Sequence, residues 1–293
     1  MLNKVWKRAA VYRLQPGKKE RIDGMGDSRV MLMNMGIAAA ISIFFPIVLL
    51  IVWKKRNKGV RLAPFFMGAA IFIVFALLLE QICHQIVLRS ESPLSAFING
   101  HTWAFVLYGA LAAGVFEETG RLVAFRIIMK KSKGKENAVT YGIGHGGVES
   151  IFVVGVSMIS SMMLVSVVHA MGGVENYAAL VPAESQDIIK ESLNTLLASP
   201  PYVFLLAGVE RISTVIFHIA LSVLVFFAAN RPGKWHLFPL AVLIHAFLDV
   251  FAVMYQRGVI KSLIFMELLI AAITAATVYF AYRIYTRDEG LIG

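Results

Sequence analysis

Seven long apolar stretches limit what this chain can fold into. Each reaches the roughly 20 residues that a helix needs to cross a hydrocarbon core of about 30 Å. Hydrophobic residues make up 58% of the chain and charged residues 16%, a balance that a soluble domain could not hide from water. The sequence therefore predicts an all-α, polytopic membrane bundle with about seven transmembrane helices, in one domain over 31–293. The stretches are 31–53, 62–87, 102–129, 138–170, 201–229, 237–256 and 261–283.

Basic residues alternate between the loops that join these stretches. They are abundant after the first, third and fifth stretches, whereas the connection over 171–200 has four acidic residues and one lysine. The positive-inside rule then places the basic loops and the C-terminus in the cytoplasm. On this interpretation the basic residues behind the formal net charge of +10 orient the membrane helices, and we expect no nucleic-acid partner. We expect an integral, multi-pass protein of a bacterial cell membrane.

The basic segment over residues 1–30 does not follow this rule. It has eight basic and three acidic residues, although seven crossings would place it outside the cell. We interpret it as a tail that an extended start adds, with the natural start at Met31 or Met33.

Ionisable residues inside the apolar stretches are the strongest functional signal. Such groups cost several kcal/mol at membrane depth unless they are paired or hydrated, so they usually face a polar cavity. The chain has thirteen of them: Glu80, Glu117, Glu118, Glu149, Glu210, Asp249, Glu267, Arg121, Arg211, His84, His145, His218 and His245.

Depth along each helix divides these residues into groups. At about 1.5 Å per residue, Glu117, His145, His218 and His245 fall about 10–18 Å from the cytoplasmic ends of four different helices. We therefore expect them at one level, in the cytoplasmic half of the membrane. Glu80 and His84 lie nearer the other side, where an interhelical polar contact is the simpler interpretation.

Spacing along the helices assigns roles within the first group. Arg121 follows Glu117 by four residues and Glu118 by three, so it can pair with one carboxylate and leave the other as a base. Three histidines suit a divalent metal, with zinc as the first choice. We predict His145, His218 and His245 as its ligands. Glu149 and Asp249, each four residues after a histidine, would ligate or orient, and glycines at 142, 144, 146 and 147 would allow close helix approach.

Several strings in this core also resemble a known family. They are FEETGRLVAF at 116–125, YGIGHGGVES at 141–150, a histidine at 218 and HAFLD at 245–249. They resemble the YhfC family of intramembrane metalloproteases, which belongs with the type II CAAX prenyl endopeptidases and the PrsW proteases. The resemblance implies Glu117 as the base, with Glu118 and Arg121 beside it, and His145, His245 and Asp249 as ligands or oxyanion donors.

The chain departs from this superfamily pattern in two places. Its first motif is E-E-x-x-R, one residue shorter than in the prenyl endopeptidases, which changes how Arg121 faces the acids. Its second motif holds both His145 and Glu149, as if two branches were combined. Both departures leave the type of substrate open.

The sequence thus favours an endopeptidase that hydrolyses a peptide bond of a membrane protein or peptide, within or beside the bilayer. Its catalytic core would span 102–256, and Glu117 or Glu118 would activate water with or without a metal. A proton-coupled or ion-coupled transporter is the first alternative, because Glu80, His84 and Glu267 place polar groups at other depths. A non-catalytic scaffold or immunity-type protein of the same fold is the second alternative.

Overall fold

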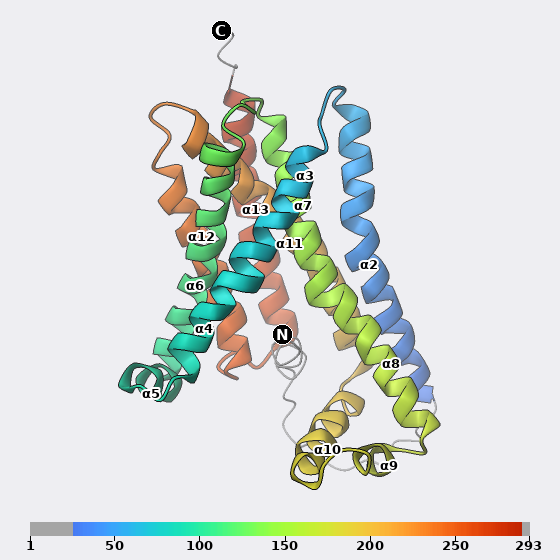
Figure 1. Ribbon diagram of the computed structural model, residues 1–293. Coiled ribbons are helices and arrows are strands. Elements are labelled where there is room, and N and C mark those ends of the chain that lie inside the picture. The colour runs from blue at the N-terminus through green and yellow to red at the C-terminus, as the bar shows by residue number, and fades with distance from the viewer. Residues whose placement is uncertain (1–25, 289–293) are drawn as a thin grey trace. The chain divides into compact units, whose positions relative to one another are not determined.

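The computed structural model describes residues 26–288, with side chains from residue 28 on. Every regular element of this part is helical, as Figure 1 shows. The elements are α2 (Gly26–Arg56), α3 (Ala63–Phe72), η1 (Ile73–Leu79), α4 (Glu80–Arg89), α5 (Pro93–Gly100), α6 (Thr102–Val123), η2 (Ala124–Ile128), α7 (Glu136–Ser150), η3 (Ile151–Gly155), α8 (Val156–Ala170), α9 (Val174–Ala178), α10 (Ala183–Leu197), α11 (Pro201–Asn230), α12 (Leu237–Gln256) and α13 (Leu263–Arg287). The three η elements are short π-helical segments that continue the helix before them.

Six helices in the described residues are long and apolar enough to cross a membrane. They end within a few residues of six of the predicted stretches, which confirms the all-α polytopic membrane bundle. The six are Ser28–Arg56, Ala63–Arg89, Glu136–Ala170, Pro201–Asn230, Leu237–Gln256 and Leu263–Arg287.

The remaining predicted stretch, 102–129, corresponds to α6 and η2. These elements form one unbroken helix, 22 residues followed by five, which is long enough to cross a membrane. It is less apolar than the other six because Glu117, Glu118 and Arg121 lie within two turns of one another. The helix that does not count among the six apolar helices is therefore the one that carries Glu117 and Glu118 of the predicted site.

The chain divides into two compact units. The first unit combines the chain up to Ile43 with Ile151–Arg211, and the second combines Phe44–Ser150 with the chain from Ile212 on. The long helices that begin with α2, α7 and α11 contribute residues to both units. The single domain expected over 31–293 stays a prediction. The basic tail falls almost entirely in 1–25, outside the described residues, and α2 begins at Gly26, before Met31 and Met33.

The first unit has a small apolar core between α2, α8, α10 and α11. Met35, Ala38 and Val165 are fully buried in it. The acidic connection over 171–200 forms α9 and α10 in this unit. His169 of α8 lies with its Nε2 3.5 Å from Oγ of Ser28 in α2.

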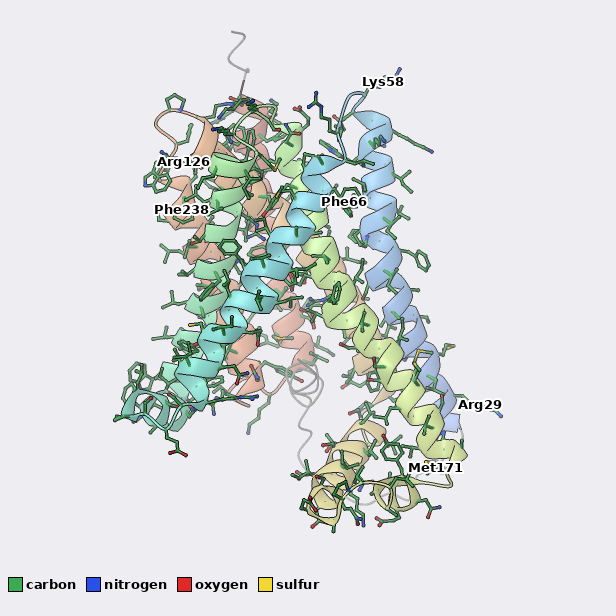
Figure 2. The ribbon with its side chains drawn as sticks, viewed as in Figure 1. Arg29, Lys58, Phe66, Arg126, Met171 and Phe238 are labelled. Atoms are coloured by element: carbon green, nitrogen blue, oxygen red, sulfur yellow. The ribbon has the colours of Figure 1, made fainter. Side chains whose placement is uncertain are left out.

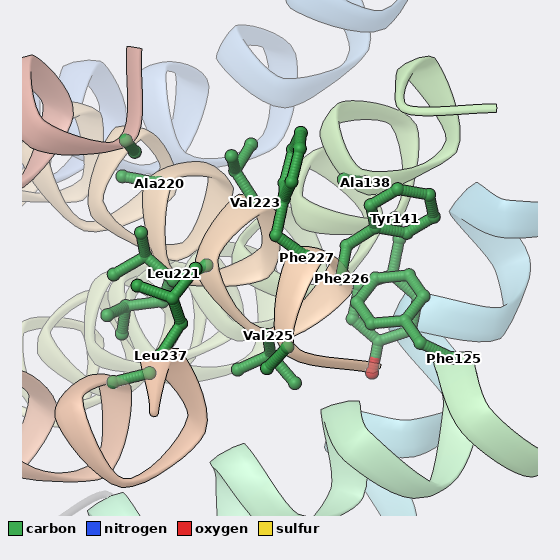
Figure 3. Packing of buried hydrophobic residues seen from close by; sticks show 14 of the residues in the cluster. Phe125, Ala138, Tyr141, Ala220, Leu221, Val223, Val225, Phe226, Phe227 and Leu237 are labelled. Atoms are coloured by element: carbon green, nitrogen blue, oxygen red, sulfur yellow. The ribbon is translucent and has the colours of Figure 1, made fainter. Parts of the chain in front are cut away.

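The second unit has a larger core, which Figure 3 shows. Aromatic rings from three helices meet there: the ring of Phe125 lies 4.6 Å from that of Tyr141 and 5.4 Å from that of Phe226, between centroids. Tyr141 is one helical turn before His145, so this core fixes one end of the predicted site.

Glycines bring the helices of the second unit into backbone contact. A Cβ on Gly144 of α7 would overlap the carbonyl oxygen of Phe65, and one on Gly68 of α3 would overlap that of Tyr141. A Cβ on Gly142 would lie 2.5 Å from Cα of Ile219 in α11. Helix α7 therefore packs against both α3 and α11 at a distance that only glycine permits, as the sequence predicted.

Candidate active site

All eight residues of the predicted site come together in the second unit. They project from α6, α7, α11 and α12, whose courses can be followed in Figure 1. Seven of the eight are buried, and Asp249 is the exception, with 24% of its side chain exposed. The eight are Glu117, Glu118, Arg121, His145, Glu149, His218, His245 and Asp249.

Glu117 is the centre of the first cluster. Its Oε2 lies 2.9 Å from Nε2 of His145 and 3.8 Å from Nδ1 of His218. Three helices thus direct one carboxylate and two imidazoles at the same point. One ligand atom from each of the three residues lies within 4.8 Å of the others, so the group could hold a metal ion.

Glu149 reaches the second histidine of this cluster. Its Oε2 forms a short contact with Nε2 of His218. Nη2 of Arg121 donates to the other nitrogen of that ring, Nδ1. A neutral His218 therefore carries its proton on Nε2 and presents the lone pair of Nδ1 toward Glu117 and Arg121. A carboxylate that fixes the tautomer of an imidazole is the usual support of a metal-binding histidine.

Glu118 and His245 form a second, drier cluster. Oε1 of Glu118 accepts from Nη1 of Arg121 and lies 2.6 Å from Nδ1 of His245. The side chains of Glu118 and Arg121 are fully buried. Nε2 of His245 lies 3.7 Å from Oδ2 of Asp249, which is too long for a hydrogen bond. Arg121 links the two clusters, because its Nη2 also lies 3.8 Å from Oε2 of Glu117.

Aromatic rings pack against the histidines of the two clusters. The ring centroids of His145 and His218 lie 5.1 Å apart, and those of His218 and His245 5.5 Å apart. Phe72 of α3 packs edge-on against His145 at 5.2 Å, and Phe217 packs edge-on against His245 at 5.8 Å. The polar groups therefore sit in apolar surroundings, where electrostatic interactions are stronger than in water.

The donor set fits a divalent metal by its chemistry. Two imidazoles and one carboxylate form a ligand set of catalytic zinc sites. Ligand atoms about 2.0–2.1 Å from a tetrahedral ion lie about 3.3 Å apart, and the two distances to Glu117 Oε2, 2.9 and 3.8 Å, fall on either side of that value. Nδ1 of His145 is buried without a hydrogen-bond partner among the described residues. Only His218 therefore has the supporting carboxylate that such ligands usually have.

The structure groups the predicted residues in a different way from their sequence spacing. Glu149, four residues after His145, contacts His218 on another helix instead. The metal-capable group contains Glu117, His145 and His218, whereas His245 is held by Glu118. The catalytic and ligand roles of the individual residues stay predictions. Phe72 was not anticipated, and no spacing pattern marks it, because it comes from a helix outside the charged set.

A separate polar cluster joins α4 to α6. Nε2 of His84 lies 2.9 Å from Oε1 of Glu80, and its Nδ1 lies 2.8 Å from the hydroxyl of Tyr108. The hydroxyl is also 3.7 Å from Sγ of Cys83. The interhelical polar contact predicted for Glu80 and His84 is therefore confirmed.

Comparison with known proteins agrees with the motifs. The model of the YhfC intramembrane metalloprotease family matches residues 41–270, which include every residue of both clusters. This chain belongs to the YhfC family. A Bacillus subtilis (strain 168) relative with the name "Uncharacterized membrane protein YhfC" is 36% identical over 257 residues, covering 87% of this chain and 97% of the relative. No solved structure matches the chain.

Membership in the YhfC family confirms the resemblance that the four strings carried. With the six apolar helices, it establishes an integral, multi-pass membrane protein. The family description names both a metal and a protease, and the name of the Bacillus relative says only that it is a membrane protein. Activity therefore has to be argued from the site.

Proposed function

We propose that this chain is an intramembrane endopeptidase that hydrolyses a peptide bond of a membrane protein or peptide. The observation that carries the proposal is the contact of Glu117 with His145 and His218, buried between helices of membrane-spanning length. Buried carboxylates and imidazoles at such depth are costly and usually functional. The family description supports the same class of reaction.

Glu117 suits the role of general base better than Glu118 does. Its side chain is 9% exposed, whereas that of Glu118 is fully buried and bound to Arg121 and His245. A water beside Glu117 would give a proton to its carboxylate, attack the substrate carbonyl, and let the carboxylate pass the proton to the leaving amine. His145 holds the carboxylate in place through its 2.9 Å contact.

Zinc, by its preference for this donor set, would be held by Glu117, His145 and His218 and would supply a water that ionises near neutral pH. Nδ1 of His218 would then bind the ion in place of its hydrogen bond from Arg121. Glu149 would keep the ring of His218 in the orientation that presents Nδ1. Glu117 then has two possible roles, ligand or base, and the two roles give different results when its charge is removed.

His245 would act on the opposite side of the carbonyl. Its Nδ1 bonds to Glu118, which leaves Nε2 directed toward Asp249 at 3.7 Å. A proton on Nε2 would stabilise the negative oxygen of the tetrahedral intermediate. Arg121 fixes the position of Glu118 and so supports this arrangement.

A cleavage assay tests the proposal. The full chain is reconstituted in liposomes with a library of single-span peptides, and new peptide termini are identified by mass spectrometry. We expect cleavage by the wild type and by Glu80→Gln, a matched loss of a buried carboxylate outside the site. Glu117→Gln should lower the rate about 10²–10⁴-fold. Equal cleavage by Glu117→Gln and the wild type would contradict the proposal.

The same variants separate the two roles of Glu117. The bound metal and the cleavage rate of Glu117→Gln are measured together. If Glu117 is the base, the variant retains its metal but no longer cleaves the peptide. If Glu117 is a ligand, the variant loses the metal as well as the cleavage activity.

A transporter remains the second candidate because of the cluster of Glu80, His84 and Tyr108. This cluster places ionisable groups outside the catalytic set, on α4 and α6. Proton-driven uptake into vesicles that Glu80→Gln abolishes and Glu117→Gln preserves would favour transport over hydrolysis.

A further inference from the structure

A hollow of about 610 Å³ lies at the end of α11 in the second unit. Its lining includes Arg126 of η2 and, from the end of α11 and the following turn, Asn230, Arg231, Gly233 and Trp235. None of the residues of the candidate active site lines it. The hollow therefore needs an explanation of its own.

Cations surround this hollow. Arg126 is exposed, and its guanidinium lies 5.3 Å above the centre of the Trp235 ring. Lys133 is exposed as well, and its Nζ donates to Oδ1 of Asn230 at 2.7 Å. Arg126 of η2 thus reaches Trp235, and Lys133 of the following loop reaches Asn230, the last residue of α11.

Arg231 adds less net charge because it is paired. Its Nε and Nη2 donate to the two carboxylate oxygens of Asp288 at 3.0 and 2.8 Å. The neighbouring guanidinium holds the pKa of Asp288 below its ordinary value, so the pair stays ionised at neutral pH. Arg126 and Lys133, which have no acidic partner among the described residues, therefore add positive charge at the hollow.

The geometry of Arg126 suits a phosphate group. The guanidinium of Arg126 lies over the Trp235 ring, and because the side chain is exposed its N–H groups can reach an anion in the hollow. Arginine binds phosphate oxygens with two parallel hydrogen bonds, and lysine adds a point charge. Arg126 and Lys133 together offer both kinds of contact.

The surroundings of the hollow are those of a membrane interface. The indole of Trp235 is 49% exposed and packs against Phe238 with ring centroids 5.3 Å apart. Ile127 and Ile128, directly after Arg126, are 63% and 51% exposed. Figure 2 shows Arg126 and Phe238 toward the same end of the second unit. Tryptophan beside basic residues marks the level of lipid headgroups, and the exposed isoleucines would meet acyl chains.

We propose that this hollow binds the phosphate of an anionic phospholipid headgroup. Basic pockets between transmembrane helices commonly recognise such headgroups. The lipid phosphate would contact Arg126 and Lys133, and its acyl chains would lie along Ile127 and Ile128. The site is separate from the candidate active site and does not depend on the chain being a protease.

Lipid binding to the purified full chain tests this proposal. The chain is kept in a neutral detergent, phosphatidylglycerol or phosphatidylcholine is titrated in, and retained lipid is counted by native mass spectrometry. We expect preference for phosphatidylglycerol. Arg126→Gln should weaken its binding about fivefold, the effect of one basic contact. Lys58→Gln removes the same charge from another basic loop of this unit and should leave binding unchanged.

Three outcomes would overturn the proposal: equal binding of the two lipids, equal binding by the Arg126→Gln and Lys58→Gln variants, or displacement of the lipid by an equal concentration of inorganic phosphate. The last result would assign the hollow to free phosphate. If Arg126→Gln fails to fold, Lys133→Gln keeps the ring contact of Arg126 and should weaken phosphatidylglycerol binding in the same direction.

Discussion

Arg121 is the one arginine among four carboxylates of the candidate active site. When ionised, Glu117, Glu118, Glu149 and Asp249 carry more negative charge than its guanidinium offsets. Buried charge without a counter-charge costs several kcal/mol. A divalent ion between Glu117, His145 and His218 would supply the missing positive charge. Metal binding would therefore stabilise the buried carboxylates, in addition to fitting the positions of the donor atoms.

Removal of Arg121 should destabilise the fold strongly. Arg121→Met leaves the carboxylate of Glu118 buried without its guanidinium, and we expect a loss of about 3–5 kcal/mol in the free energy of unfolding. The double variant Arg121→Met with Glu118→Gln should recover part of this loss, since the carboxylate left without its guanidinium at position 118 is no longer charged. Denaturant unfolding in detergent micelles measures both. A double variant less stable than the single one would contradict this account of the pair.

Glu149 should act on metal affinity through His218. Because its carboxylate contacts Nε2 of that ring, Glu149→Ala frees the imidazole and should weaken metal binding about 10–100-fold. Glu149→Gln retains an acceptor oxygen and should weaken it less. Competition against a chelator measures the affinity. Glu80→Ala, which removes the carboxylate beside His84, is the matched control and should have no effect. Unchanged affinity in Glu149→Ala would contradict the positioning role.

At the scale of helices, α7 is held in place by backbone contact. A methyl group on Gly144 would overlap the Phe65 carbonyl oxygen and push α7 away from α3. Since α7 carries His145 and Glu149, the same displacement would disturb the site.

Gly144→Ala should therefore lower stability by about 1–3 kcal/mol and weaken metal binding at the same time. Gly36→Ala in α2 is the control, because its Cβ would meet only the end of the Met162 side chain, at ordinary distances of 3.7 Å and 4.0 Å from Cε and Sδ. Thermal unfolding and metal titration of the two variants make the comparison. Equal changes in stability and metal affinity in the two variants would show that the close approach of α7 to α3 does not contribute to stability.

The sequence predicted the helices well and their partners less well. The limits of the apolar runs predicted the ends of α11 and α12 to within a residue, because prolines and polar residues flank these runs and end the helices. Depth along each helix placed Glu117, His145, His218 and His245 at one level, and the structure brings these four residues together. The four-residue spacing suggested that the carboxylate of Glu149 would contact His145, but it contacts His218 instead. Periodicity tells which residues share a face of one helix, and it does not tell which neighbouring helix packs against that face.

At the scale of the whole molecule, the placement of the loops relative to the membrane is a prediction from charge. The positive-inside rule places the basic α6–α7 connection in the cytoplasm and the acidic connection over 171–200 outside. One membrane-spanning stretch, Glu136–Ala170, separates the two connections.

Single cysteines test this orientation in a Cys83→Ser background. A membrane-impermeant maleimide should label Glu184→Cys in intact cells and label Lys131→Cys only after the membrane is opened. The reverse pattern would move the basic loops outside and contradict the orientation.

The central claim is that His145 and His218 hold a metal ion beside Glu117, and the metal content of the purified chain tests it most directly. Elemental analysis compares the wild type, His218→Ala and His84→Ala, the last being a matched loss of an imidazole outside the centre. We expect one divalent ion per chain in the wild type and in His84→Ala, and its loss in His218→Ala. A wild-type chain that binds no divalent ion, or a His218→Ala chain that keeps its ion, would contradict the account.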